Sequence, residues 1–277
     1  MTVSDDDYAF LKALMQERLG HRLDDGKGYL INSRLGPLVQ ERGHRDVGGL
    51  LQEVRNGDAH LRSAVVEAMT INETSFFRDY QVFAALRDVV LPELVRTRSG
   101  RLSFWSAAAA SGQEAYSLAM MMEDDFPRVP TPTILATDVS NAALDQARAG
   151  RYTQLEVNRG LPVQALTRHF TQVDRDWYIR PDLRNRVEFR QLNLAGPWPA
   201  LRPMDLILLR NVLLYLHDDT RSRVLHHAAR ALRPGGYLVL GSAENMMADL
   251  PELESVVVGR TVLRRAPGAI EGAADAG

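Results

Sequence analysis

The sequence predicts an α/β protein in two parts: a small all-helical N-terminal domain, then a doubly wound domain with a mostly parallel sheet. In about the first 70 residues, apolar side chains recur at helical spacing. Beyond them, strand-like apolar runs alternate with amphipathic helical stretches, which is the pattern of a parallel sheet covered by helices. The run at residues 205–209 is almost continuously apolar and is typical of a strand buried on both faces.

The N-terminal helices carry start and stop signals. Ser4 followed by three aspartates indicates a helix N-cap with acid in the first turn, and Gly20 ends that helix. A second helix is expected over residues 27–42, although Pro37 in its middle opposes a continuous helix. Two more helices are predicted over residues 47–54 and 60–69.

The second part begins with a helix over residues 80–91, expected to end near Pro92. Strands are predicted over residues 102–105, 133–137, 187–189, 205–209 and 237–240, and helices over 113–122, 141–149 and 220–232. Two runs, 256–258 and 261–263, suit a terminal antiparallel pair, and the tail 266–277 is expected to be disordered. The predicted domains are therefore 1–70 (helical), 71–92 (linker and lid segment) and 93–265 (α/β).

The composition excludes several classes of protein. A formal net charge of −2 gives no strong attraction to nucleic acid or anionic lipid. The chain has no cysteine, and no cluster of His, Asp and Glu has the spacing of a metal site. Its acidic start lacks the basic region of a signal peptide, and no apolar run approaches the roughly 20 residues of a membrane span. We therefore expect a cytoplasmic protein without membrane insertion, and nothing in the sequence requires more than a monomer.

The run at residues 71–78 is the most informative segment of the chain. It contains two adjacent phenylalanines, whereas loops favour Gly, Pro, Asn, Asp and Ser. We interpret this run as an anchored lid, in which the phenylalanine rings dock into a core. The polar side chains of Asn72, Thr74 and Arg78 would then point at a polar group.

Ligands of an open α/β sheet bind outside the carboxyl ends of its strands, so polar residues at those ends are the candidates for a site. Small residues at 106–112 let the backbone approach a ligand, but they lack the G-x-G-x-x-G and P-loop patterns. Glu114 would repel phosphate and accept from an ammonium, which favours a nucleoside with an amino-acid tail. Alternatively, the small residues only allow tight packing, and Glu114 is a first-turn partner of the helix dipole.

Two further strand ends carry polar groups. Asp138 ends a strand at a place where an acid can accept both hydroxyls of a ribose. Alternatively, it caps the helix that follows, a role that Ser140 can fill instead. Arg210 and Asn211 directly follow the buried strand, and Tyr215 continues this polar rim, the alternative being an ordinary turn at a surface strand end.

These motifs resemble the CheR-type chemotaxis receptor glutamate methyltransferases, which use S-adenosylmethionine. The matching segments occur in the order of that family and span most of the chain, with a looser match at 29–35. They are residues 72–78, 105–108, 111–117, 136–138, 189–194, 210–215, 234–236 and 241–245. Each motif alone is a weak signal, whereas the ordered set is specific.

The resemblance implies a helical domain, a linker and a Rossmann-like methyltransferase domain, with S-adenosylmethionine as cofactor and S-adenosylhomocysteine as product. Carried over by motif, the cofactor-binding residues are Asn72, Thr74, Arg78, Glu114, Asp138, Asn193, Leu194, Arg210 and Asn211. The chain departs from the family at Ala109, Ala110 and Ala115, and none of these changes removes a charged contact.

The acceptor implied by the resemblance is a glutamate side chain on a cytoplasmic methylation helix of a chemoreceptor, for adaptation in bacterial chemotaxis. Such a carboxylate, with a pKa of about 4.3, is ionised at neutral pH and needs no general base. Arg78 would bind the methionine carboxylate, Glu114 its ammonium and Asp138 the ribose. Tyr215 would orient the acceptor carboxylate.

The helical domain would bind the acidic acceptor helix. Lys27, Arg34, Arg42 and Arg45 lie on or beside the second helix and offer it positive charge, the alternative being a solvated basic face. Some family members carry a three-stranded insertion that binds a receptor pentapeptide, and the short stretch at about 150–186 favours independence from that tether.

Two other functions stay open. One is a regulatory module that binds the cofactor or its product without turnover, and the other is a methyltransferase with a different acceptor.

Overall fold

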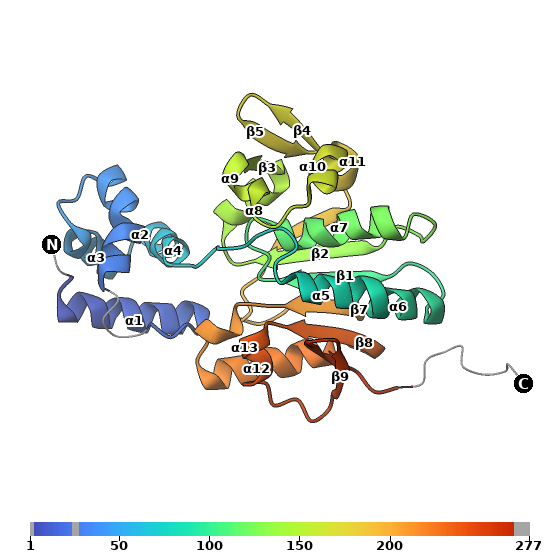
Figure 1. Ribbon diagram of the computed structural model, residues 1–277. Helices are drawn as coiled ribbons and strands as arrows, with labels where there is room; N and C mark the ends of the chain where they lie inside the picture. Colours follow the sequence, from blue (N-terminus) through green and yellow to red (C-terminus); the bar gives the residue numbers. More distant parts are fainter. Residues whose placement is uncertain (1–2, 24–27, 269–277) are drawn as a thin grey trace, which may run out of the picture. The chain divides into compact units, whose positions relative to one another are not determined.

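The computed structural model describes residues 3–23 and 28–268, and the chain forms two compact units (Figure 1). The first unit contains Met1–Ile71 together with two segments from later in the chain, Asn193–Pro197 and Tyr215–Arg221. The second unit contains Asn72–Leu192, Trp198–Leu214 and Ser222–Gly277. The first unit is helical and the second is α/β, which confirms the predicted fold class, while the linker at 71–92 stays a prediction.

The first unit contains the predicted helices α1 (Asp5–Leu19), α2 (Gly28–Glu41), α3 (Val47–Arg55) and α4 (Ala59–Ala68). Ser4 caps α1 by accepting from the backbone N–H of Asp7 at 3.2 Å, and Gly20 ends this helix with a left-handed φ of +63°. Pro37 lies inside α2, which continues through it. Lys27 lies outside the described residues.

A later segment of the chain is hydrogen-bonded to the end of α1 within this unit. The N–H of His217 donates to the carbonyl of Gly20 at 2.8 Å, and the N–H of Arg22 donates to the carbonyl of Tyr215 at 2.7 Å. These two bonds flank His21, which takes part in an isolated antiparallel bridge. The sequence carries no signal for this pairing, because the partners lie far apart along the chain.

Stability should depend on pH through His21. Burial lowers the pKa of its imidazole to about 4, from 6.5 in the unfolded chain. Between pH 4 and 6.5 the unfolded chain binds more protons than the folded one, because His21 is protonated only in the unfolded chain. We therefore predict that the free energy of unfolding falls by about 2–3 kcal/mol as the pH is lowered from 6.5 to 4. Well above pH 6.5 His21 makes no contribution to its pH dependence. Urea unfolding of the wild type and His21→Gln across this range tests the prediction, and identical pH profiles for the two proteins would contradict it.

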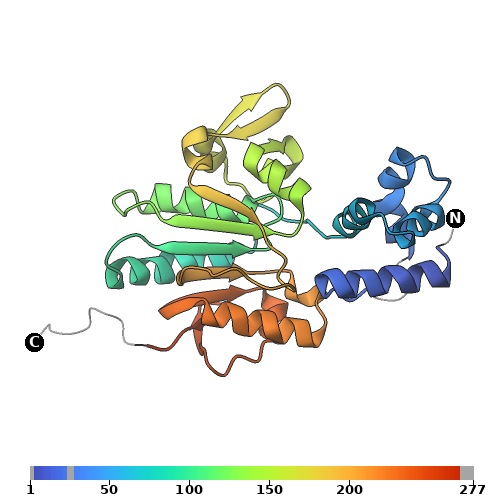
Figure 2. The ribbon, with the colours of Figure 1, turned by 180° about the vertical axis from the view of Figure 1, so that it is seen from behind.

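The second unit is built on a seven-stranded sheet of order β6-β2-β1-β7-β8-β10-β9 (Figures 1 and 2). Its strands are β1 (Ser103–Ala107), β2 (Thr133–Asp138), β6 (Val187–Gln191), β7 (Met204–Leu209), β8 (Leu232–Leu240), β9 (Glu254–Val258) and β10 (Thr261–Arg265). Along the order β6-β2-β1-β7-β8 each strand is parallel to its neighbour, whereas β10 runs antiparallel to both β8 and β9. The mostly parallel sheet and the terminal antiparallel pair are both as predicted.

Helices cover both faces of this sheet. On one face lie α5 (Tyr80–Ala85), the π-helical turn η1 (Leu86–Val90), α6 (Leu91–Thr97) and α7 (Gln113–Asp125), as Figure 1 shows. They share one core with alternate strand residues such as Phe104 and Leu206. Figure 2 shows α12 (Asp218–Arg230) on the opposite face, where His227 packs on Trp198. α8 (Asn141–Ala149) packs on β2 and β6.

The predicted helix end near Pro92 is wrong, because the helical segment continues to Thr97. Pro92 stands in the first turn of α6, where its missing N–H needs no partner. The wider π-helical turn directly before it absorbs the interruption of the hydrogen-bond ladder.

A second, antiparallel sheet has the order β3-β5-β4. It comprises β3 (Arg151–Thr153), β4 (Phe170–Val173) and β5 (Asp176–Ile179), with α9 (Gln154–Asn158), α10 (Val163–His169) and α11 (Pro181–Arg184) beside them in the chain. The stretch at 150–186 is therefore long enough for a three-stranded sheet, so its length gives no support for independence from a receptor tether. That independence stays a prediction.

Within residues 3–23 and 28–268, no helix has the length and apolar character needed to cross a bilayer.

Candidate cofactor site at the carboxyl ends of the parallel strands

The topological switch point of the sheet lies between β1 and β7. The chain moves from β1 outward to β2 on one side, and from β7 outward to β8 on the other. The two central strands end in register, with Ala107 opposite Leu209. A ligand of an open α/β sheet binds outside these carboxyl ends, so the loops that follow β1, β2 and β7 form the candidate site.

Arg210 and Glu114 form a buried ion pair at this crevice. Nη1 of Arg210, whose side chain is 1% exposed, donates to Oε2 of Glu114 at 2.9 Å. Oε1 of Glu114 accepts from the hydroxyl of Ser106 at 2.8 Å. Nη2 of Arg210 donates to the carbonyl of Arg78 at 3.0 Å and to the carboxylate of Asp79. The structure thus joins Arg210 directly to Glu114, two residues that the sequence indicated separately. Ser106 and Asp79 are further partners of this pair that no sequence pattern marked.

The carboxylate of Glu114 retains hydrogen-bonding capacity for a ligand. A carboxylate offers about four acceptor positions, and the bonds above use two of those on Glu114. Nε of Arg210 is buried and has no hydrogen-bond partner within the described part of the chain. A buried carboxylate beside a buried guanidinium suits a zwitterionic ligand that carries both an ammonium and a carboxylate.

Asp138, the last residue of β2, holds two backbone segments. Its Oδ2 accepts from the N–H of Ala110 at 2.8 Å, and its Oδ1 accepts from the N–H of Ser140 at 2.9 Å. The cap of α8 is Ser140, whose hydroxyl accepts from the N–H of Ala143 at 3.1 Å. The side chain of Asp138 therefore ties the end of β2 to the loop after β1 and to the backbone at the start of α8.

The loop between β1 and α7 is strained. Ala108 and Ala110 have left-handed φ angles of +57° and +47°, which cost an L-residue about 1–2 kcal/mol each. Gly112 has a φ of +91°, and a Cβ there would lie 2.9 Å from the methyl carbon of Ala147. The bond from Ala110 to Asp138 helps to hold the loop in this conformation.

Replacing Ala108 with glycine should relieve this strain and raise the free energy of unfolding by about 0.5 kcal/mol, after the entropy of the glycine is subtracted. Ala109→Gly is the matched control, because Ala109 is buried and has no positive φ. We expect this control to destabilise the protein by about 1 kcal/mol. Urea unfolding measures both changes, and equal destabilisation by the two substitutions would show that the loop is not strained.

The phenylalanines of the predicted lid dock into the core of the second unit. Phe76 is fully buried, with its ring edge-on to Tyr152 and Phe170 at centroid distances of 5.0 and 5.5 Å. Phe77 packs against the same core, and its N–H donates to the hydroxyl of Ser117 at 2.9 Å. The anchoring that the sequence predicts for these two rings is therefore present.

The polar side chains of this segment take different positions. Arg78 donates from Nη1 to the carbonyl of Glu73 at 3.0 Å, so its side chain folds back on its own segment. Asn72 is exposed and Thr74 is half-buried, and neither side chain forms a hydrogen bond with another of the described residues. Arg78 reaches the crevice through its carbonyl, and the assignment of all three side chains to the cofactor stays a prediction.

The turn after β7 depends on a distant carboxylate. Asn211 has a left-handed φ of +61°. The N–H groups of Asn211, Val212 and Leu213 all donate to the carboxylate of Glu244 at 2.8 Å. Glu244 lies in the short helix α13 (Ser242–Asn245) and is 1% exposed. No sequence signal identifies this role, because the partners are 31 to 33 residues earlier in the chain.

Three predicted site residues belong to the first unit. The side-chain amide of Asn193 donates to the carbonyl of Arg18 at 2.6 Å, and Leu194 is buried. The ring of Tyr215 lies 6.2 Å from that of His21, measured between centroids. The assignment of Asn193, Leu194 and Tyr215 to the site stays a prediction.

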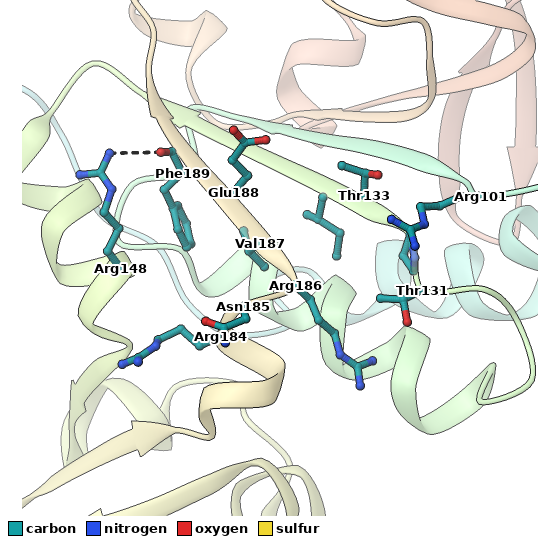
Figure 3. A pocket seen from close by; sticks show the side chains of 12 residues that line it. Arg101, Thr131, Thr133, Arg148, Arg184, Asn185, Arg186, Val187, Glu188 and Phe189 are labelled. Carbon is teal, nitrogen blue, oxygen red and sulfur yellow. Dashed lines mark hydrogen bonds between the residues drawn. The ribbon is translucent and has the colours of Figure 1, made fainter.

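A separate hollow of about 590 Å³ lies at the opposite, amino ends of β2 and β6 (Figure 3). Four arginines line it, and their guanidinium groups point in different directions rather than toward one point. Arg148 and Arg184 donate to backbone carbonyls, and Arg186 pairs with Glu123 at 2.6 Å. Because this hollow is remote from the carboxyl ends of the strands, it is not the cofactor crevice.

Two family models match the chain. The model for the SAM binding domain of CheR methyltransferase matches residues 72–262, and the model for the all-alpha domain of CheR methyltransferase matches residues 6–70. The chain belongs to the CheR methyltransferase family. This membership makes S-adenosylmethionine the cofactor and methyl transfer the reaction class, as the sequence predicts.

Two chemotaxis protein methyltransferases are similar to this chain along almost their whole length. Chemotaxis protein methyltransferase 1 of Pseudomonas aeruginosa is 38% identical over 260 residues, covering 91% of this chain and 94% of the relative. The protein of the same name from Vibrio cholerae is 38% identical over 262 residues, covering 92% and 95%. Among solved structures, the glycopeptide N-methyltransferase MtfA complexed with sinefungin is 13% identical, with a TM-score of 0.38 and coverage of 72% and 73%. The two relatives associate this CheR-family chain with methylation in chemotaxis.

Proposed function

We propose that this CheR-family methyltransferase methylates glutamate side chains of chemoreceptors and produces glutamyl methyl esters. In the crevice, the carboxylates of Glu114 and Asp138 both accept hydrogen bonds from donors of the protein. Neither carboxylate is therefore free to act as a general base. An acceptor glutamate has a pKa of about 4.3 and is already ionised at neutral pH, so it needs no base. The names of the relatives support a chemoreceptor as the acceptor.

S-adenosylmethionine, when bound, supplies a methyl group on a positively charged sulfur, and a carboxylate oxygen of the acceptor takes that methyl group by in-line displacement. The new C–O bond forms as the methyl–sulfur bond breaks, so a positive and a negative charge disappear together. A crevice that excludes water favours this loss of charge. The other contribution of the protein is to hold the two reactants in line, which lowers the barrier without acid–base chemistry.

The proposed contacts follow the chemistry of the residues. Arg78 pairs with the carboxylate of the methionine moiety, and Glu114 accepts from its ammonium. Asp138 accepts from the ribose hydroxyls, and Tyr215 orients the acceptor carboxylate. Arg210 holds Glu114 in place through their ion pair. The remaining members of the proposed set are Asn72, Thr74, Asn193, Leu194 and Asn211.

We propose that the helical unit binds the acidic methylation helix of the receptor. Nη2 of Arg42 pairs with Asp58 at 2.6 Å, and Arg34 donates to the carbonyl of Met69 at 2.8 Å, so both guanidinium groups are already engaged. Arg45 is exposed, and its side chain forms no hydrogen bond or ion pair with another of the described residues. The proposal therefore depends chiefly on Arg45 among the three arginines.

Asp138→Ala should abolish measurable binding of S-adenosylhomocysteine, because it removes the proposed ribose acceptor and frees the loop at Ala110. We expect a loss of at least about a hundredfold, from two hydrogen bonds to a charged group. Ser140→Ala is the matched control, since it removes the cap of α8 at a cost of about 1 kcal/mol but keeps the carboxylate. Calorimetry gives the three affinities, and equal binding by the two variants would contradict the assignment.

Receptor methylation is tested with methyl-labelled S-adenosylmethionine and a chemoreceptor cytoplasmic fragment. We expect base-labile label on the fragment, lost when its acceptor glutamates are changed to alanine. Binding of the cofactor without any label on the fragment would exclude this acceptor. Unchanged cofactor after that incubation would favour a regulatory module without turnover, and label on another molecule would favour a different acceptor.

A further inference from the structure

The carboxylate of Glu244 is a buried anion that accepts hydrogen bonds from four backbone N–H groups. Its Oε1 accepts from Val212 and Leu213, each at 2.8 Å. Its Oε2 accepts from Asn211 at 2.8 Å and from Gly241 at 2.7 Å. The side chain is buried, and its two oxygens thus accept two short hydrogen bonds each.

Three of these donors are consecutive residues of the turn that follows β7. Consecutive N–H groups directed at one point form a concave site for an anion, which Glu244 fills from within the protein. Asn211 adopts a left-handed φ of +61° in this turn, a conformation that asparagine tolerates better than most non-glycine residues. Without the carboxylate, these N–H groups would lose their acceptor, and the turn would lose the contact that determines its shape.

The close approach of the Glu244 carboxylate to the backbone depends on a glycine at position 241. A Cβ at residue 241 would lie 2.5 Å from Oε2 of Glu244, so the close approach of the carboxylate requires Gly241. The same Cβ would lie 3.3 Å from the side-chain nitrogen of Asn211. Glycine at this position therefore allows the end of β8 to bring the carboxylate against the turn.

We infer that Glu244 is a positioning residue for cofactor binding, which acts by fixing the turn that carries Arg210 and Asn211. The inference rests on the proposed assignment of these two residues to the cofactor site. Arg210 directly precedes the first of the three donors, and its guanidinium must reach Glu114 across the crevice. Glu244 itself does not contact the reactants, and its carboxylate sets the backbone from which the ion pair is built.

Glu244→Gln tests this role with little change of volume. A glutamine has one acceptor oxygen, and its NH₂ group would face N–H donors. We expect the Kd for S-adenosylhomocysteine to rise by about tenfold to a hundredfold. The matched control is Asp205→Asn, because Asp205 is also fully buried and accepts from the N–H of Ser103 at 2.8 Å, but at the amino end of β7.

Both variants should lower the melting temperature, and only Glu244→Gln should weaken binding by more than about threefold, since the control is distant from the crevice. Calorimetry is done well below both melting temperatures. A Kd of Glu244→Gln within about threefold of the wild type, or an equal loss of affinity in Asp205→Asn, would overturn the inference. Because product binding needs no receptor, these results do not depend on whether glutamate is the acceptor.

Hydrogen exchange keeps the inference testable if Glu244→Gln does not fold. In the wild-type protein, the amides of Asn211, Val212 and Leu213 should exchange as slowly as those of β7, since all three are bonded to a buried carboxylate. Fast exchange at these three amides beside a protected β7 would overturn the inference. In a folded variant, exchange should increase at residues 211–213 and stay unchanged in β7.

Discussion

The buried ion pair between Arg210 and Glu114 is the interaction on which the crevice depends, because it connects the turn after β7 to the first turn of α7. Taking either charge out of water costs several kcal/mol, and removing one partner of such a pair costs about 3–5 kcal/mol. Ser106 and Asp79 supply the further contacts that make the pair tolerable in a buried place. The ends of β1 and β7 are therefore held together before any ligand arrives.

The loops around this pair are shaped by carboxylates that accept from backbone N–H groups. Asp138 holds the loop after β1, and Glu244 holds the turn after β7. Both loops contain non-glycine residues with left-handed φ angles, Ala110 and Asn211 among them, and the one at Ala110 costs about 1–2 kcal/mol. Charge-assisted bonds to the backbone offset that cost, so acidic residues at the ends of strands give the crevice its form as well as its charge.

The small three-stranded sheet contributes to the same region through aromatic packing. Tyr152 in β3 and Phe170 in β4 surround the ring of Phe76, the anchor of the segment that carries Arg78. A Cβ at Gly160 would lie 2.1 Å from the carbonyl oxygen of Phe76, so glycine is needed for this close approach. The stretch at 150–186 is thus part of the support of the segment before α5.

Local sequence patterns alone determined the fold class, both caps of the first helix and most of the strands, because periodicity and capping act between near neighbours in the chain. They also indicated Glu114, Asp138 and Arg210, since carboxyl ends of parallel strands meet at one edge of a sheet. Only the tertiary structure decided that a helix continues past Pro92, that later segments join the helical unit, and that Glu244 shapes the turn after β7. The last two features depend on hydrogen bonds and packing between residues distant in the chain, which leave no periodic trace in the sequence. Pro92 is accommodated by the π-helical turn directly before it, which no residue pattern indicates.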